Sequence, residues 1–182
     1  MISKKTVRVL RLLAWAALAC ALALFNAPSG TDTPSYDSDA PVGHEVGQQL
    51  PDFTISTLDG GTFRLRDCRG KYTVLNLWAT WCTPCVQELP LFDRLAREYP
   101  EKVAVLAIHS DLITDDVTAY LAAFDYSMPL AVDESGEVTA ALSGSVMLPQ
   151  TVVLDPYGVV TYNRVGPVSY EALQELIQEQ KK

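Results

Sequence analysis

The 182-residue sequence predicts an α/β fold, and three observations support this prediction. Its apolar content of 48% and charged content of 20% are those of a globular protein. Residues 72–78 and 103–109 are nearly continuous apolar and β-branched runs, as expected for strands buried on both faces. Between them, residues 83–99 carry apolar side chains at helical spacing. Strands that alternate with helices in this way form a mostly buried sheet covered by helices.

The first residues predict an export segment. Residues 1–11 carry four basic side chains and no acid, and the apolar stretch "LLAWAALACALALF" follows. This order is typical of a signal peptide. As a helix the stretch would span about 21 Å, less than the roughly 30 Å hydrocarbon core of a bilayer. We therefore predict that residues 1–27 are a signal peptide or an uncleaved membrane anchor, and either places the body outside the cytoplasm. Lipid modification at Cys20 is a weaker third alternative, because the residues after it stay apolar.

Residues 28–46 are rich in Pro, Ser, Gly and Asp without an apolar period, which predicts a flexible acidic linker. We interpret His44, which lies in it, as a solvated residue. The chain after residue 30 holds 10 basic and 22 acidic residues. Nucleic acid is therefore not an expected partner, because its phosphates are bound by Lys and Arg. Residues 47–182 form the predicted domain.

The domain begins with "DFTIST", the turn "LDGG" and "TFRL", which predict a hairpin of two short strands. Pro90 should bend the helix predicted over 83–99. The later elements, in order, are a helix over 114–124, a strand over 128–133, a helix over 136–142, strands over 150–155 and 159–165, and a helix over 169–182. We expect Ser169 to cap the last helix, because serine is a preferred residue at helix N-termini.

Three readings of the Cys82-Thr83-Pro84-Cys85 motif differ in how well they fit the sequence. A structural disulfide between Cys82 and Cys85 would close a very short loop and stabilise little. A zinc site needs three or four ligands, and the other candidates, Cys68, His44 and His109, do not stand at ligand spacing. We therefore expect no metal at this motif.

A redox pair explains every local feature of the motif. Cys82 falls where a strand meets a helix, so the free N–H groups and dipole of the first helical turn favour a thiolate there. Pro84 suits an early helical position, where a missing N–H costs nothing. Cys85 lies about one turn further along, placed to attack a mixed disulfide formed at Cys82 and release the partner.

The stretch "LNLWATWCTPCVQELP" resembles the active-site segment of the thioredoxin superfamily, and most of all its TlpA/ResA-like extracytoplasmic thiol-disulfide oxidoreductases. The resemblance runs from about Gly47 to the C-terminus and includes "LPDFTISTLDGGTFRLRDCRGK" and "LPQTVVLDPYGVV". It implies a thioredoxin-like fold, with a central mixed β-sheet flanked by helices and an added N-terminal β-hairpin.

The resemblance also implies roles for single residues. Pro149 matches the cis-proline of the family and would hold Leu148 so that its backbone pairs with an incoming peptide. Trp81 would pack beside the cysteine pair as part of the substrate-binding surface. Thr83 and Pro84, between the cysteines, would belong to the same substrate-binding surface and would tune the reduction potential.

Two positions depart from thioredoxin itself. Asn76 stands where thioredoxin has a buried aspartate for proton transfer, and an amide cannot titrate. Glu88 lies three residues after Cys85 on the same helical face and matches a glutamate of the reductase branch, so we expect it to handle protons. We assign no role to Cys68 and expect a structural role for His109, which is near neither motif in the sequence.

These features predict an extracytoplasmic protein-disulfide reductase, in which Cys82 attacks, Cys85 resolves and Glu88 manages protons. It needs no cofactor beyond the redox-active disulfide Cys82–Cys85. The implied partners are exported disulfide-containing proteins, apocytochromes c among them, and a membrane thiol electron donor. The implied location is the membrane surface through the N-terminal segment, with secreted or lipid-anchored forms as alternatives.

Three rival functions use the same scaffold. A thiol oxidase would run the same chemistry in reverse, and the motif does not reveal the direction. A peroxidase is less well supported, because the Pro-x-x-x-Thr-x-x-Cys signature is absent around Cys82. A metallochaperone of this fold would use Cys-x-x-x-Cys and a later His, whereas the spacing here is Cys-x-x-Cys.

Overall fold

A computed structural model describes residues 40–110, 117–143 and 147–178, which all belong to one compact unit, Pro34–Lys182. The predicted export segment 1–27 and the first part of the predicted linker lie outside these ranges. Within them, no helix has both the length and the apolar content needed to cross a bilayer.

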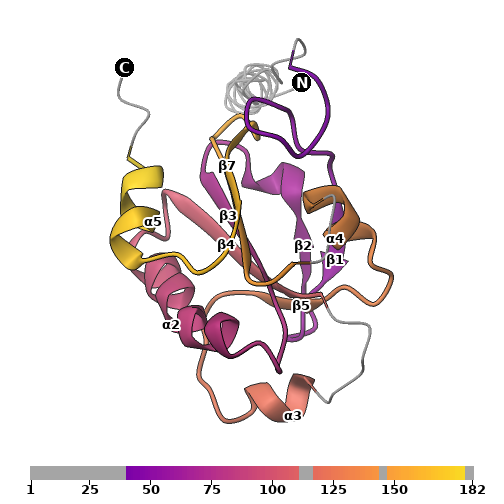
Figure 1. Ribbon diagram of the computed structural model, residues 1–182, viewed down its shortest axis with the longest axis vertical. Helices are drawn as coiled ribbons and strands as arrows, with labels where there is room; N and C mark the ends of the chain where they lie inside the picture. The colour runs from indigo at the N-terminus through magenta and orange to yellow at the C-terminus, as the bar shows by residue number, and fades with distance from the viewer. Residues whose placement is uncertain (1–39, 111–116, 144–146, 179–182) are drawn as a thin grey trace, which may run out of the picture. The chain divides into compact units, whose positions relative to one another are not determined.

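A five-stranded mixed sheet forms the centre of this unit (Figure 1). Its strands lie in the order β5-β4-β3-β6-β7, with β3, β4 and β5 parallel and β6 and β7 antiparallel to their neighbours. The strands are β3 (Tyr72–Trp78), β4 (Val103–His109), β5 (Leu130–Val132), β6 (Gln150–Leu154) and β7 (Val160–Val165). The prediction of a central mixed sheet is confirmed, and β3 and β4 have the predicted bounds.

Helices cover both faces of this sheet. Figure 1 shows α2 and α5 on one side, and α4 with the β1–β2 hairpin on the other. The helices are α2 (Thr83–Glu98), α3 (Val117–Leu121), α4 (Glu137–Leu142) and α5 (Tyr170–Leu176), with a 3₁₀ turn η1 (Leu65–Cys68). The hairpin pairs β1 (Thr54–Ser56) with β2 (Thr62–Arg64) and confirms the predicted N-terminal hairpin.

The two sides of the sheet have separate hydrophobic cores. Along β3, Val74 and Trp78 pack toward α2, whereas Leu75 and Leu77 pack toward the hairpin and α4. All four side chains are buried, because consecutive residues of a strand point to opposite faces and both faces are covered. This explains why the sequence of β3 is apolar throughout instead of alternating. Thr73 and Asn76 are the buried polar residues within this run, and Asn76 belongs to the candidate functional site.

Two helices are shorter than predicted. The helix predicted over 114–124 ends at Leu121 in the structure, and residues 111–116 lie outside the description. Helix α5 ends at Leu176, one residue before the buried Ile177. The residues after Ile177 are polar, so extending the helix would bury no further apolar surface. Ser169 caps α5 as predicted, accepting a hydrogen bond from the N–H of Ala172 at 3.2 Å.

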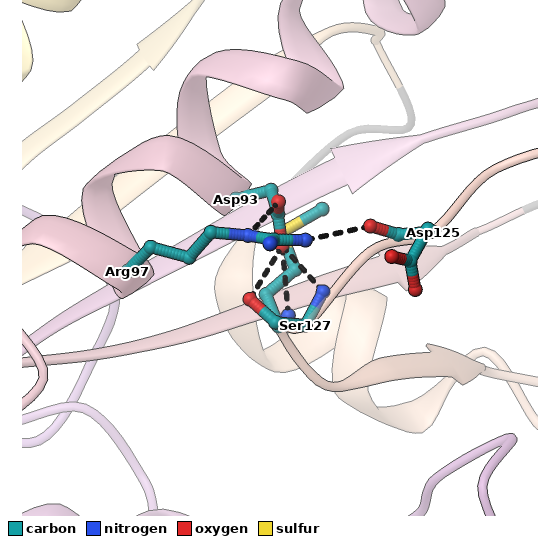
Figure 2. Close-up of polar contacts among 5 residues, drawn as sticks. Asp93, Arg97, Asp125 and Ser127 are labelled. Atoms are coloured by element: carbon teal, nitrogen blue, oxygen red, sulfur yellow. Dashed lines mark hydrogen bonds and ion pairs between the residues drawn. The ribbon is translucent and has the colours of Figure 1, made fainter.

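A buried carboxylate on α2 holds the loop between α3 and β5 (Figure 2). Asp93 of α2 accepts hydrogen bonds from the N–H groups of Ser127 and Met128, at 2.6 and 3.0 Å. Arg97, one turn further along α2, donates to Asp93 and to the backbone carbonyl of Asp125. The loop is thereby fixed against α2.

Part of the predicted linker is hydrogen-bonded to this unit. Asn163 of β7 donates to the carbonyl of His44 at 2.8 Å, and Gly47, the first residue after the predicted linker, donates its N–H to the carbonyl of Val160 in the same strand. Gly43 donates to the carbonyl of Gln49. His44 thus contributes its backbone carbonyl to a contact with β7.

Candidate redox site

The cysteine pair lies where β3 leads into α2, the place predicted from the sequence. Cys82 and Cys85 form a disulfide, and their Cα atoms are 5.3 Å apart. Cys82 occupies the N-cap position of α2, and Pro84 lies in the first turn of the helix. The N–H of Cys82 donates to the carbonyl of Ala79 at 3.1 Å, which closes a tight turn before the helix.

Exposure differs strongly among the residues of the motif. Cys85 is fully buried, and only 5% of Cys82 is exposed, less than expected for the attacking cysteine. Both cysteines belong to the core between the sheet and α2, which explains this low exposure. Trp81 is 62% exposed, and Thr83 and Pro84 are exposed as well. The exposed residues of this segment are thus the three that flank Cys82.

Glu88 is a buried carboxyl group one turn after Cys85. Only 3% of it is exposed, and its two oxygens accept hydrogen bonds from Asn76 Nδ2 at 2.8 Å and from the N–H of Val168 at 3.2 Å. Burial raises the pKa of Glu88 from 4.5 to about 7, although the two hydrogen bonds favour the charged form. A carboxyl group with this pKa can hold or release a proton near neutral pH.

Asn76 is thus the partner of Glu88 in the structure. It lies on β3, fully buried, on the sheet face that carries α2. Its Nδ2 also lies 3.5 Å from the carbonyl of Gln150 on β6, while its Oδ1 has no hydrogen-bond partner. An amide at this position donates to a carboxylate without adding a second negative charge, so Glu88 is the titrating member of the pair.

The peptide bond between Leu148 and Pro149 is cis, the conformation that the family resemblance implies. Pro149 is buried, and Leu148 packs against the core that contains both cysteines. Met147, which we did not predict, is 55% exposed directly before them. A large apolar side chain directly before Leu148 and Pro149 is a signal in the sequence that could have indicated Met147 as a residue of the site.

His109 lies against the loop before the redox pair, which the sequence did not indicate. Its Nε2 accepts a hydrogen bond from the N–H of Thr80 at 3.4 Å, and Thr80 precedes Cys82 by two residues. Cys68 has a different position. It packs against the core on the opposite face of the sheet, and burial raises the pKa of its thiol.

In the part of the chain that the structure describes, no three His, Cys, Asp or Glu side chains gather as a metal site. Among the described residues of this site, the cysteine pair is capable of thiol-disulfide chemistry, and Glu88, with its pKa of about 7, can exchange a proton near neutral pH.

The chain resembles known proteins over most of the part that the structure describes. Residues 46–163 match the AhpC/TSA family. The chain is 36% identical over 137 residues to the thioredoxin-like protein YneN of Bacillus subtilis, covering 74% of this chain and 79% of that protein. It is 32% identical to the thiol-disulfide oxidoreductase ResA of Bacillus thuringiensis, covering 74% and 78%.

Two solved structures show the same fold. A putative thiol:disulfide interchange protein from Chlorobium tepidum superposes with a TM-score of 0.65 at 30% identity, over 73% of this chain and 95% of that one. An exposed lipoprotein thioredoxin from Streptococcus pneumoniae gives a TM-score of 0.65 at 29% identity, over 71% and 99%. With the family match extending from the N-terminal hairpin through the cysteine pair to β7, the chain belongs to the AhpC/TSA family and has a thioredoxin-like fold.

Proposed function

We propose that this chain is an extracytoplasmic thiol-disulfide oxidoreductase that reduces disulfides of exported proteins through Cys82 and Cys85. The observation that carries this proposal is the disulfide between them at the N-terminus of α2, one turn before the buried Glu88. The relatives named as thiol-disulfide oxidoreductase and thiol:disulfide interchange protein support the same activity.

The reaction transfers two electrons from the reduced pair to a substrate disulfide. The Cys82 thiolate attacks one substrate sulfur, forms a mixed disulfide and releases the other substrate sulfur, which takes up a proton. Cys85 then loses its proton and attacks the Cys82 sulfur. This step forms the Cys82–Cys85 disulfide and releases the second substrate sulfur as a thiolate, which then takes up a proton.

Glu88 is the proton acceptor that we assign to the second step. Cys85 is fully buried, so its thiol has little access to water as a base. Glu88 lies three residues later on the same helical face, and its pKa of about 7 allows it to take up a proton at neutral pH. Asn76 and Val168 hold the carboxylate in place before the transfer.

A substrate strand would bind next to the disulfide along the cis-proline segment. We assign backbone pairing to Leu148, which Pro149 orients, and side-chain contact to the exposed Trp81. The exposed Thr83 and Pro84 border the same approach to Cys82. Backbone pairing with an extended peptide suits a protein that acts on many exported substrates, apocytochromes c among them.

Residues 1–27 would either anchor the enzyme on the extracytoplasmic face of the cell membrane or direct its export. Residues 28–46 would link this segment to the domain over 47–182. A membrane thiol carrier would return two electrons to the Cys82–Cys85 disulfide after each turnover. Such a donor is required because each reaction leaves the pair oxidised.

Reduction of insulin by dithiothreitol tests the activity. We expect the wild-type protein to accelerate it, and Cys82→Ser to lower the rate to that of dithiothreitol alone. Cys68→Ser is the matched control, because Cys68 packs on the opposite face of the sheet and should leave the rate unchanged. A Cys82→Ser variant with the wild-type rate would show that the mechanism is wrong.

The reduction potential of the pair tests the direction. Equilibration in defined thiol buffers should give a value around −250 mV or lower for a reductase. A value around −120 mV would instead identify a thiol oxidant. The outcome would then direct the search to the protein that re-oxidises the pair.

A further inference from the structure

His109 connects the central sheet to the turn that carries the redox pair. It is the last residue of β4 and pairs in the sheet with Trp78, the last residue of β3. Its ring is buried and stands edge-on to the Trp78 ring, with centroids 5.1 Å apart. Its Nε2 accepts the hydrogen bond from Thr80, which lies inside the turn closed between Ala79 and Cys82.

This contact requires one tautomer of the ring. A ring nitrogen that accepts a hydrogen bond carries no proton, so the contact with Thr80 requires the proton of the imidazole to be on Nδ1. Trp78 holds the ring plane from the side, which directs Nε2 toward the N–H of Thr80. The ring therefore links the end of β4 to the turn before Cys82.

The link matters more in one redox state than in the other. In the oxidised protein the disulfide itself holds Cys82 against Cys85 at the start of α2. Reduction breaks this bond and leaves Cys82 held by its backbone hydrogen bonds to Ala79, in the turn that contains Thr80, and to Val86 in the first turn of α2. A thiolate is stabilised at a helix N-terminus only while it stays near the free N–H groups of the first turn.

We propose that His109 is a positioning residue for the redox pair: through Thr80 it holds the turn that keeps the reduced Cys82 at the N-terminus of α2. This inference rests on the proposed function, since it concerns the reduced form of the same pair. It predicts that the His109 contact stabilises the dithiol more than the disulfide.

Two variants separate the acceptor nitrogen from the bulk of the ring. His109→Phe keeps an aromatic ring against Trp78 but has no acceptor for Thr80. His109→Gln keeps an acceptor, because its side-chain oxygen can take the place of Nε2. His44→Gln is the matched control, since the contact of His44 with Asn163 uses its backbone carbonyl.

The readout is the equilibrium with glutathione, in which the protein dithiol and oxidised glutathione exchange with the protein disulfide and two reduced glutathione molecules. Loss of one neutral hydrogen bond should shift the equilibrium constant of His109→Phe about two- to tenfold toward the disulfide. The ultraviolet absorbance of the thiolate should show less ionised Cys82 in this variant. His109→Gln and His44→Gln should both stay close to the wild type.

A purely structural role gives a different result. It would lower the thermal stability of the oxidised and reduced forms equally and leave the equilibrium constant of His109→Phe unchanged, which would overturn the proposal. Wild-type protein labelled at histidine nitrogen provides a test that needs no variant. Nuclear magnetic resonance should show the Nδ1–H form of His109 in the reduced protein, and an Nε2–H form there would equally overturn it.

The same experiments distinguish this inference from the proposed function. If wild-type protein fails to reduce insulin, the function is wrong whatever the variants do. If it succeeds and His109→Phe keeps the wild-type equilibrium constant, only the role of His109 is wrong.

Discussion

Glu88 combines burial with hydrogen bonding in a way that makes its charge depend on pH near neutrality. Its carboxyl group is withdrawn from water, which favours the protonated form, while Asn76 and Val168 donate hydrogen bonds that favour the anion. Burial has the larger effect, so the pKa is raised to about 7. An aspartate in place of Asn76 would add a second buried charge and raise the pKa of Glu88 further.

This raised pKa predicts how stability changes with pH. The folded oxidised protein binds the Glu88 proton more tightly than the unfolded chain, whose ordinary pKa is 4.5. The resulting stabilisation is complete below about pH 4.5 and is lost as pH rises through about 7, an effect on the order of 3 kcal/mol. Glu88→Gln, which stays neutral, should remove this dependence.

Urea unfolding of the oxidised protein at about pH 5 and about pH 8 measures this pH dependence of stability. In the folded protein Glu88 is largely protonated at the first pH and ionised at the second. The exposed Glu101 supplies the control, and Glu101→Gln should keep the wild-type difference between the two pH values. Equal pH dependence in Glu88→Gln and the wild type would contradict the assignment.

At the scale of elements, α2 carries the redox pair at one end and holds the loop before β5 near the other. Asp93 makes this second attachment with four hydrogen bonds, from Ser127 N–H and Oγ, Met128 N–H and Arg97 Nε (Figure 2). Burial opposes the charge of Asp93, but these bonds outweigh it and hold its pKa below the ordinary value.

Asp93→Asn should therefore destabilise the protein by about 1–3 kcal/mol. The amide nitrogen of asparagine cannot accept a hydrogen bond, so either the bond from Arg97 or the bonds from Ser127 and Met128 would be lost. Chemical denaturation at neutral pH measures the loss. Asp125→Asn is the control, since Arg97 contacts Asp125 through its backbone carbonyl. Equal effects of the two substitutions would show that the carboxylate of Asp93 is not what fixes the loop.

The N-terminus of α5 is fixed by hydrogen bonds of two neighbouring residues. Ser169 accepts from the N–H of Ala172, and the preceding residue, Val168, donates to Glu88. Ser169→Ala should lower the free energy of unfolding by about 1 kcal/mol, whereas Ser169→Thr keeps an acceptor and should lose less. Comparable losses in both variants, measured by urea unfolding, would argue against the cap.

At the scale of the whole described unit, the sheet depends on both of its cores. Leu75 of β3 is fully buried on the face covered by the hairpin and α4, opposite the face that carries the redox pair. Leu75→Ala should cost about 2–5 kcal/mol of stability, because it removes buried methyl groups and leaves a cavity. Leu58→Ala, at a position that is 40% exposed, is the control and should cost much less. Thermal or urea unfolding that gave the same loss for both would contradict this account of the core.

The sequence by itself determined the type and order of the elements and pointed to the residues that we propose as the reacting groups. The apolar runs of β3 and β4 mark strands buried on both faces, so their bounds could be predicted to the residue. The Cys-x-x-Cys spacing before a helix, with Glu88 one turn later, is equally local. These features depend on residues only a few positions apart, where strand and helix periodicity control which side chains meet.

Only the tertiary structure decided which distant groups complete the site. Val168 reaches Glu88 across 80 residues, and His109 reaches Thr80 across 29. Both contacts follow from the order of the strands in the sheet, which has no local signal in the sequence. The low exposure of Cys82 likewise depends on the core that closes around it, because burial is a property of the packed fold and not of a motif.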